Sequence, residues 1–453
     1  MILITTPIWI SSQQLLRLNN QMLNFIIRKA VNNPRIRRAM TALFQLYRDK
    51  QIIMSLDIPE ITPIGISKSE ILASRINLLV PGISAKAMFG GVSTALDVFL
   101  LLAKDFENVR IIVTDEHQPI AGIETTKLKD FVVASMEDEL NGKVVVWAGD
   151  RYGKSMPVRN KDFFVATAWW TARIGFEIFD EQNKLSSEST RRLFYIIQDY
   201  EPNFYAWSSR FALAHSTYSR ENDTVAIINS SLLANYLKVR GHSFQLECMF
   251  EPKLNMQLRE RLEKLENPNK QRLIFVYGRP GVQRNAFELV VQSLRAWASS
   301  GKAAENGWTV VSAGEEHEDI QLGGGLTLTS LGKLSLDGYA ELLEKSAVGL
   351  SLMMSPHPSY PPLELAAFGA GVVTNSFESK NLSSLHPSIH SVTYPDPGKL
   401  AEAIAWKCYE FELDNEINWR RRKQFGWPYL DSSTPFEPGD KISSFLRTLS
   451  DTI

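Results

Sequence analysis

The segment EPKLNMQLRERLEKLENPNKQ, residues 251–271, decides how the chain divides. It is highly charged, contains no strand-like run and ends in a Pro/Asn turn, which is typical of a helix and linker between domains. A chain of 453 residues is also too long for one ordinary hydrophobic core. We therefore expect a folded domain on each side of this segment.

On both sides, short apolar runs alternate with helical segments, the signature of parallel βαβ units. Before the segment, strands are expected at residues 76–82, 109–115, 143–149, 163–169, 193–199 and 223–229. After it, they are expected at residues 272–278, 308–314, 326–332, 347–353, 371–376 and 391–395. The sequence thus predicts an α/β protein with two Rossmann-like domains.

The expected parts of the chain follow from this pattern. They are a basic helical extension (1–75), an N-terminal Rossmann-like domain (76–250), the linker (251–271), a C-terminal Rossmann-like domain (272–410) and closing helices (411–453). In the extension, residues 32–50 have the pattern of a basic amphipathic helix. Docking on an anionic membrane surface is one interpretation, and packing on the main body with a solvated basic face is favoured over it.

Composition excludes several classes of protein. The hydrophobic content of 44% and the net charge of -1 describe a globular protein and argue against a nucleic-acid binder, which needs a basic surface. Cys248 and Cys408 match no metal-ligand spacing, so reduced thiols are expected. No apolar run is long enough for a membrane span, and the first residues lack the pattern of a signal peptide. A cytoplasmic location, with peripheral contact at the inner face of the membrane left open, is the expectation.

Ligands of open parallel sheets bind beyond the carboxyl ends of the strands. After the first strand, Gly90 and Gly91 precede a helical pattern, so their amides could approach a phosphate or a sugar; for the glycine pair taken alone, a packing turn is favoured. Arg279 and Arg284 follow the first strand of the second half, and Lys333 follows its third strand. Three cations at one sheet edge suit a diphosphate.

The segment SPHPSYPPLELAAFGAG, residues 355–371, completes this edge. Pro361 and Pro362 suit the start of a helix, where a missing N–H costs nothing. Glu364 is then expected in the first turn. The helix dipole alone could explain an acidic residue there; the functional interpretation is that Glu364 accepts a hydrogen bond from a ligand hydroxyl.

The first half offers candidates for a second substrate. Trp169 and Trp170 are expected to close a strand at the ligand edge, and Asp199 and Glu201 follow another strand. Trp170, Asp199 and Glu201 are therefore candidates for gripping an acceptor sugar. The sequence contains no Asp-x-Asp, HExxH or GxSxG motif, so neither a metal nor a hydrolase triad is expected.

Together, the two α/β halves, the glycine turn, GRPGVQR and PPLELAAFGAGVVTN resemble a GT-B glycosyltransferase, and LE-x-AA-x-G resembles the nucleotide-binding signature of glycosyltransferase family 4. More closely, AMFGGVSTAL, ATAWWTA, IQDYEPNFYAWSS, VYGRP and SLMMSPHPSYPPLELAAFG are similar to the WsaF-type bacterial rhamnosyltransferases. The resemblance spans about residues 76–448, and the proline segment is its most specific part.

The resemblance implies a central cleft between the two domains and a role for each: the C-terminal one holds a nucleotide-sugar donor and the N-terminal one faces the acceptor. Glu364 would bind a hydroxyl of the nucleotide's sugar and Tyr360 would lie near the donor sugar. The residues implied to hold the diphosphate are Arg279, Arg284 and Lys333, with Gly90 and Gly91 closing from the other domain. For catalysis, Arg279, Lys333 and Asp199 are the candidates. The implied donor is dTDP-β-L-rhamnose, the acceptor a growing bacterial surface glycan, with no metal or other cofactor.

One position departs from the wider family, which carries two glutamates eight residues apart. Pro356 stands where the first would be, and His357 or Tyr360 could substitute for it. Two other functions stay open: a nucleotide-sugar epimerase of the same architecture, and a non-catalytic scaffold that binds nucleotide sugars.

Overall fold

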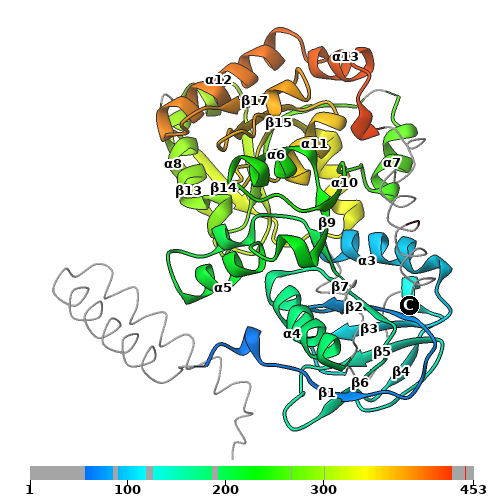
Figure 1. Ribbon diagram of the computed structural model, residues 1–453. Helices are drawn as coiled ribbons and strands as arrows, with labels where there is room; N and C mark the ends of the chain where they lie inside the picture. The colour runs from blue at the N-terminus through cyan, green and yellow to red at the C-terminus, as the bar shows by residue number, and fades with distance from the viewer. Residues whose placement is uncertain are drawn as a thin grey trace, which may run out of the picture. The chain divides into compact units, whose positions relative to one another are not determined.

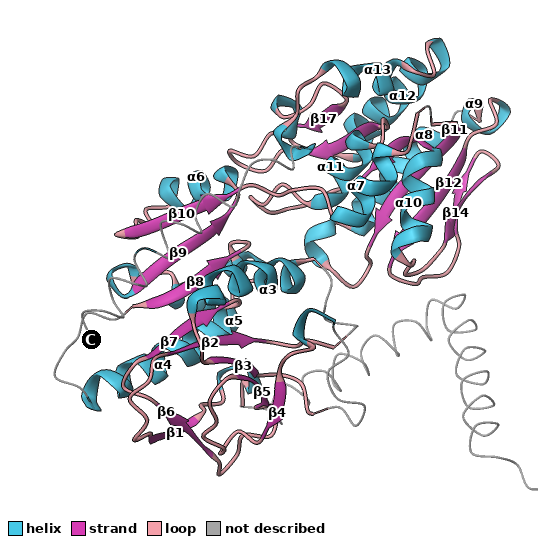
Figure 2. Ribbon diagram, turned by 90° about the vertical axis from the view of Figure 1, so that its right-hand side faces the viewer, coloured by secondary structure: helices cyan, strands magenta, loops and turns pink. Residues whose placement is uncertain are grey.

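The computed structural model describes residues 57–84, 90–118, 126–185, 192–266, 268–299, 301–430 and 444. The predicted basic helix, residues 32–50, lies outside these described residues. From Pro63 onward the chain forms one compact unit. Within that unit, Figures 1 and 2 show two separate sheets with helices packed beside them.

The first sheet is parallel throughout, in the order β10-β9-β8-β7-β2-β3-β5-β4. Its strands are β2 (Arg75–Val80), β3 (Val109–Val113), β4 (Val132–Ala134), β5 (Lys143–Trp147), β7 (Asp162–Ala166), β8 (Leu193–Ile197), β9 (Thr224–Asn229) and β10 (Leu246–Phe250). All predicted strands of this half are present, and β4 and β10 add an unpredicted strand at each edge. A small separate pair joins β1 (Gly65–Lys68) to β6 (Ser155–Val158), so pairing of the main body starts inside the predicted extension.

The second sheet has the order β13-β14-β12-β11-β15-β16-β17. Its strands are β11 (Gln271–Gly278), β12 (Thr309–Gly314), β13 (Ile320–Gly323), β14 (Leu326–Ser330), β15 (Ser346–Leu350), β16 (Gly371–Asn375) and β17 (Ile389–Val392). All predicted strands of this half are present as well. The unpredicted β13 is antiparallel to β14, and the other pairings are parallel.

Helices cover the sheets and connect the parallel strands (Figure 1). The first half contains α3 (Gly91–Leu102), α4 (Trp169–Leu185), α5 (Ser209–Thr217) and α6 (Ser231–Val239), and the predicted linker contains α7 (Met256–Glu263). The second half contains α8 (Phe287–Ala298), α9 (Lys302–Glu305), α10 (Leu336–Lys345), α11 (Tyr360–Ala367), α12 (Pro397–Leu413) and α13 (Ile417–Gln424). Among the helices that the structure describes, none combines the length and the apolar character that a membrane crossing requires.

The central strands are buried on both faces, which explains their continuous apolar sequences. Every residue of β2, β3, β7 and β8 in the first sheet is buried, as is every residue of β15 and β16 in the second. Two core clusters built almost wholly from residues 64–250 flank the first sheet, and two built almost wholly from residues 254–430 flank the second. Each half therefore has its own hydrophobic interior.

The two sheets share one strand order, which fixes where ligands can bind. Numbered along the chain, the predicted strands of each half follow the doubly wound order 3-2-1-4-5-6. The order reverses between β2 and β7 in the first sheet and between β11 and β15 in the second. Because ligands of such sheets bind beyond the carboxyl ends at this reversal, the loops after these four strands define the expected site.

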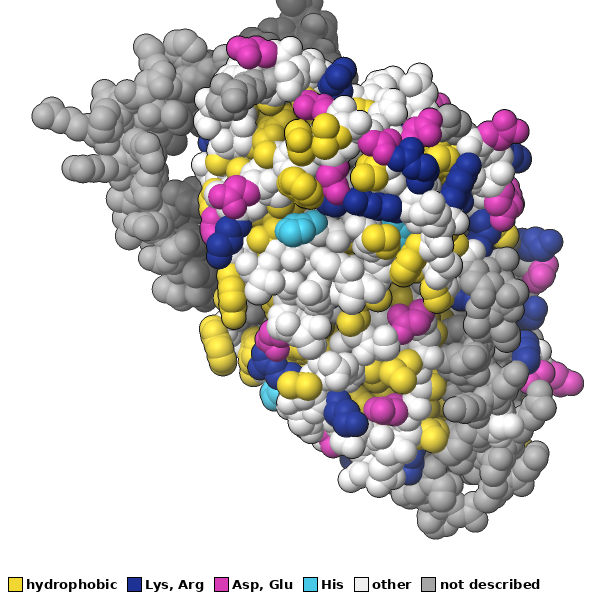
Figure 3. Space-filling model, turned by 90° about the horizontal axis from the view of Figure 1, so that it is seen from above, with side chains coloured by type: hydrophobic (Ala, Val, Ile, Leu, Met, Phe, Trp, Pro, Cys, Tyr) yellow, Lys and Arg dark blue, Asp and Glu magenta, His cyan; other side chains and the backbone are white. Residues whose placement is uncertain are grey.

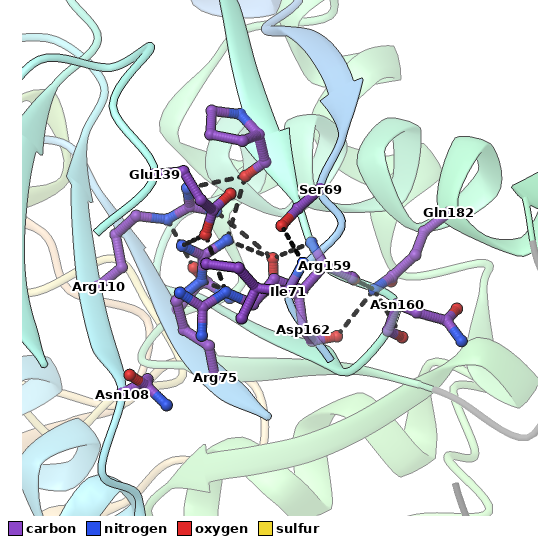
Figure 4. A network of polar contacts seen from close by, with 12 residues as sticks. Ser69, Ile71, Arg75, Asn108, Arg110, Glu139, Arg159, Asn160, Asp162 and Gln182 are labelled. Atoms are coloured by element: carbon purple, nitrogen blue, oxygen red, sulfur yellow. Dashed lines mark hydrogen bonds and ion pairs between the residues drawn. The ribbon is translucent and has the colours of Figure 1, made fainter. Parts of the chain in front are cut away.

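A buried charge network holds the opposite, amino end of the first sheet (Figure 4). Asp162 accepts hydrogen bonds from Arg75 Nε and Nη2, both at 2.8 Å, and from the Arg159 backbone N–H at 2.8 Å. Arg110 Nη2 lies 3.6 Å from Asp162, and Glu139 pairs with Arg75 and Arg159 at 3.1 and 2.9 Å. Burial raises the pKa of Asp162, but the hydrogen bonds and charges of the arginines leave it below its usual value. The network therefore stabilises the amino ends of the strands, which lie at the edge of the sheet away from the expected site.

Candidate active site

The proline segment forms the loop after β15 and the start of α11. Ser359, the residue before the helix, has a φ of 67°, a left-handed conformation that a non-glycine residue adopts only under strain. Because the helix begins at Tyr360, Glu364 lies in its second turn, and the prediction of a first-turn position is wrong. The dipole effect falls off within the first turn, so it does not account for this glutamate.

A glycine seats α11 on the sheet. A Cβ atom at Gly349, in β15, would lie only 2.4 Å from Leu365 Cδ1. The helix therefore packs closer to the strand than any side chain at this position would allow. This close packing fixes the distance between α11 and the sheet. It thereby positions Glu364, the neighbour of Leu365, at the carboxyl edge of the second sheet.

Glu364 is buried and is held by one phenol. Tyr339 Oη, from α10, donates a hydrogen bond to Glu364 Oε2 at 2.5 Å, and the described residues donate none to Oε1. Burial raises the pKa of Glu364 to about 7, and the Tyr339 hydrogen bond opposes that rise. The site thus presents a carboxyl group with one oxygen engaged and one available to a ligand.

The predicted cations lie at the same edge as Glu364. Burial raises the pKa of Tyr277, near the end of β11, and the charges of Arg279, Glu364 and Arg284 all act on this phenol. Arg279 Nε is 3.4 Å from Glu315, whose carboxylate also accepts the Gly281 N–H at 2.7 Å.

Lys333 is exposed in the loop after β14. Its neighbour Gly332 accepts a hydrogen bond from the Gly314 N–H at 2.9 Å. A Cβ at Gly314 would in turn lie 3.0 Å from Arg279 Cγ. The loops after β11, β12 and β14 therefore meet, and they bring Lys333 to the edge that carries Arg279.

The side chain of Arg284 contacts the first domain. Its guanidinium lies 4.2 Å from the centre of the Phe204 ring, which comes from the first half of the chain. Its Nε is buried and has no hydrogen-bond partner among the described residues. A buried guanidinium N–H is costly without an acceptor, and an anionic ligand would supply one.

Asp199, from the first half of the chain, contacts the proline loop of the second half. Its Oδ1 accepts hydrogen bonds from Ser355 Oγ at 2.5 Å and from the Tyr200 N–H at 2.8 Å. Burial raises the pKa of Asp199, and the charges of Arg284 and Lys380 oppose that rise. Lys380 is itself buried, donates to the Met353 carbonyl at 2.6 Å, and has its pKa lowered by burial to about 7.

A second contact between the halves joins Tyr360 to the glycine turn. Tyr360 Oη lies 3.4 Å from Thr94 Oγ1 and 3.4 Å from Asn229 Nδ2. Thr94 in turn donates to the carbonyl of Gly90, the residue before α3, at 3.2 Å. Gly90 has a φ of 54° and Gly91 begins the helix, as the glycine turn predicted. The structure therefore brings Tyr360 and this turn together.

His357, a candidate substitute for the missing glutamate, is buried in the same loop. Its Nδ1 accepts the Ser359 N–H at 3.0 Å. Burial, with the charges of Lys380 and Arg284, lowers the pKa of His357 to about 3. The ring is therefore uncharged and its Nδ1 is already engaged, and its role as a substitute stays a prediction. The carboxylate of Asp199 reaches Ser355, the residue directly before Pro356.

The remaining acceptor candidates differ in position. Trp169 and Trp170 begin α4 rather than ending β7, so the predicted strand is too long here. Trp170 Nε1 donates to Asp115 at 2.9 Å at the sheet edge. Glu201 is buried and accepts hydrogen bonds from the Trp169 N–H and from Tyr195. Burial raises the pKa of Glu201 to about 8, and its contacts tie it to the start of α4.

Several residues of the site escape the sequence patterns. Ser355, Lys380 and Phe204 contribute through contacts with distant parts of the chain, which no local motif signals. Tyr339 lies within an ordinary amphipathic helix. Asn229 is the exception, because it ends β9 at the carboxyl edge, where polar residues were sought. No group of His, Cys, Asp or Glu side chains among the described residues is arranged to hold a metal ion.

Solved structures share this architecture. Sucrose-phosphate synthase from Thermosynechococcus elongatus aligns over 84% of this chain and 100% of its own, with a TM-score of 0.54 and 13% identity. HepE of Anabaena, solved in complex with UDP, aligns over 84% of this chain and 100% of its own, with a TM-score of 0.51 and 13% identity. At these identities the likeness shows the fold.

Two Rossmann-like domains joined by a linker, with site residues from both, are the architecture of the GT-B fold of glycosyltransferases. Family models described as the WsaF N-terminal domain and the WsaF C-terminal domain match residues 75–231 and 272–405. The chain belongs to the WsaF family. It is also 37% identical over 217 residues to the O-antigen biosynthesis protein RfbC of Myxococcus xanthus. That match covers 47% of this chain and 16% of the much longer relative.

Proposed function

We propose that the protein transfers a sugar, L-rhamnose from dTDP-β-L-rhamnose, to a growing bacterial surface glycan. The observation that carries this proposal is the convergence of Glu364 and Arg284 from the second domain with Asp199 from the first. A nucleotide-sugar donor needs a hydroxyl acceptor and fixed positive charge, and a glycan acceptor needs a base. The likeness to a protein named for O-antigen biosynthesis supports a surface glycan as the product.

In the proposed reaction, Glu364 accepts a hydrogen bond from the nucleotide's sugar. The residues that hold the diphosphate are Arg279, Arg284 and Lys333. The bond between the donor sugar's anomeric carbon and the diphosphate breaks, and the cations stabilise the negative charge that leaves. A bond forms between that carbon and an acceptor hydroxyl. Residues of this chain supply the positive charge, so we propose that no metal is required.

We assign the acceptor's proton to Asp199. Its carboxylate lies beside Ser355, next to the position where the wider family carries its first glutamate. A raised pKa suits a group that must take up a proton near neutral pH. Closure of the two domains around the donor would also exclude water and limit hydrolysis. Trp170 would line the acceptor side.

Product analysis tests the function. The full chain would be incubated with dTDP-L-rhamnose, first alone and then with rhamnose-containing oligosaccharides, with and without a chelator. We expect dTDP release and a lengthened oligosaccharide in both acceptor reactions. A changed sugar without acceptor would identify an epimerase, and loss of activity with chelator that magnesium restores would contradict the metal-free mechanism.

The variant Asp199→Asn separates transfer from binding. It should bind dTDP as the wild type does, while kcat falls by a factor on the order of 10² to 10⁴. If the protein binds nucleotide sugars and makes no product with any acceptor, the scaffold interpretation gains and the proposal fails.

A further inference from the structure

The contact between Tyr339 and Glu364 carries an inference that deepens the proposed function and rests on it. The phenol approaches one carboxylate oxygen at 2.5 Å, at the short end of the range for a hydrogen bond to a charged oxygen. Tyr339 packs edge-on against Phe275 of β11, with ring centres 5.8 Å apart, so its orientation is fixed. The hydroxyl therefore occupies one of the two acceptor positions of Oε2 before any ligand arrives.

A carboxylate recognises a pentose through its ring hydroxyls. A ribose has two neighbouring hydroxyls, which can donate one hydrogen bond to each carboxylate oxygen, as a bidentate pair. A 2′-deoxyribose has only the 3′-hydroxyl and needs one acceptor oxygen. Because Tyr339 already donates to Oε2, only Oε1 of Glu364 is left without a hydrogen bond from the described residues. One such oxygen matches a single ligand hydroxyl.

We propose that Tyr339 is a positioning residue that reserves one oxygen of Glu364 and thereby selects a 2′-deoxynucleoside diphosphate over its ribonucleotide counterpart. A ribonucleotide would bring a second hydroxyl to a carboxylate that has one acceptor oxygen already engaged. A polar group desolvated without a partner weakens binding. The selection acts on the pentose and does not depend on the base or the transferred sugar.

The test compares UDP with dUDP, which differ only in the 2′-hydroxyl. Calorimetric titrations of the full chain would be made at about pH 9, because the pKa of Glu364 is raised to about 7 and the carboxylate must be ionised. Wild-type protein should bind dUDP about tenfold more tightly than UDP, the effect of one hydrogen-bonding mismatch. In Tyr339→Phe, Oε2 is released and the two affinities should become about equal.

A matched variant controls for the loss of a hydroxyl. Tyr429 has a buried hydroxyl with no hydrogen-bond partner among the described residues, and burial and the charge of Glu364 raise its pKa. Tyr429→Phe should therefore keep the wild-type preference for dUDP. An equal change in both variants would mean a general packing effect and would overturn the selection role.

The pH dependence gives a second readout. Since the Tyr339 hydrogen bond lowers the pKa of Glu364, its removal should move the fall in dUDP affinity on acidification to higher pH. A wild type that prefers UDP, or a Tyr339→Phe variant with an unchanged preference, overturns the inference. The wild-type measurement decides even if the variant fails to fold. Failure of dTDP as well as both uracil nucleotides to bind the wild type would overturn the proposed function itself.

Discussion

Ser355 Oγ donates a hydrogen bond to Asp199 Oδ1 at 2.5 Å, although the two residues are 156 positions apart. The serine belongs to the loop after β15 in the second sheet, and the aspartate follows β8 in the first. The hydrogen bond thus joins the two domains at the point where the proposed transfer takes place.

Removing the serine hydroxyl should change how activity depends on pH. Burial raises the pKa of Asp199 and the Ser355 hydrogen bond opposes this, so Ser355→Ala should raise that pKa further. A base must be deprotonated, and we therefore expect the acidic limb of kcat/KM to move to higher pH. Ser293→Ala, which removes a hydroxyl bonded within α8, is the control and should leave the profile unchanged.

Arg284, whose buried Nε has no hydrogen-bond partner among the described residues, should contribute mainly to donor binding. Arg284→Met keeps an apolar stem over Phe204 and removes the charge, so KM for the nucleotide sugar should rise by about tenfold or more, as expected for a hydrogen bond to a charged group. Arg272→Met, at the exposed amino end of β11, should leave KM unchanged. An unaltered KM in the first variant would remove Arg284 from the diphosphate site.

The buried Glu201 should make the protein less stable in mild alkali. Its pKa is raised by burial from 4.5 to about 8, so its contribution to stability is complete below about pH 4.5 and is lost as pH rises through about 8. The neutral isostere in Glu201→Gln cannot ionise and should flatten this decline. Urea unfolding at several pH values measures it, with on the order of 1 kcal/mol expected for each unit of raised pKa. Parallel declines in both proteins would contradict the assignment.

The charge network at the amino end of the first sheet should affect stability and not binding. Asp162→Asn leaves Arg75, Arg110 and Arg159 facing Glu139 alone, and breaking a buried ion pair costs about 3–5 kcal/mol. We expect a lower urea midpoint and unchanged dTDP affinity in the folded variant. A weakened affinity would mean that changes at this edge of the sheet reach the proposed nucleotide site.

The sequence predicted the two-domain α/β architecture because buried parallel strands leave a strong local signal. It placed Glu364 in the correct helix and one turn too early, since Tyr360 preceding the prolines begins α11. It ended a strand at Trp169, where the chain has already turned into α4. Apolar and aromatic residues suit both elements, so composition alone could not locate that boundary.

For the candidate site, the sequence indicated single residues but not the contacts between them. Polar positions after strands pointed to Arg279, Arg284 and Asp199, and their catalytic and binding roles remain predictions. Their partners were hidden, because Ser355 and Phe204 reach Asp199 and Arg284 only through the folded arrangement of distant segments. Tyr339 carries no motif and becomes meaningful only through the orientation of its hydroxyl toward Glu364.

The separate hydrophobic interiors of the two halves have a thermodynamic consequence. Each half buries its own apolar surface and can melt as its own cooperative unit, so scanning calorimetry of the free protein should resolve two heat-absorption peaks. A donor held by residues of both halves couples their unfolding. Saturating nucleotide sugar should therefore draw the two peaks together into one.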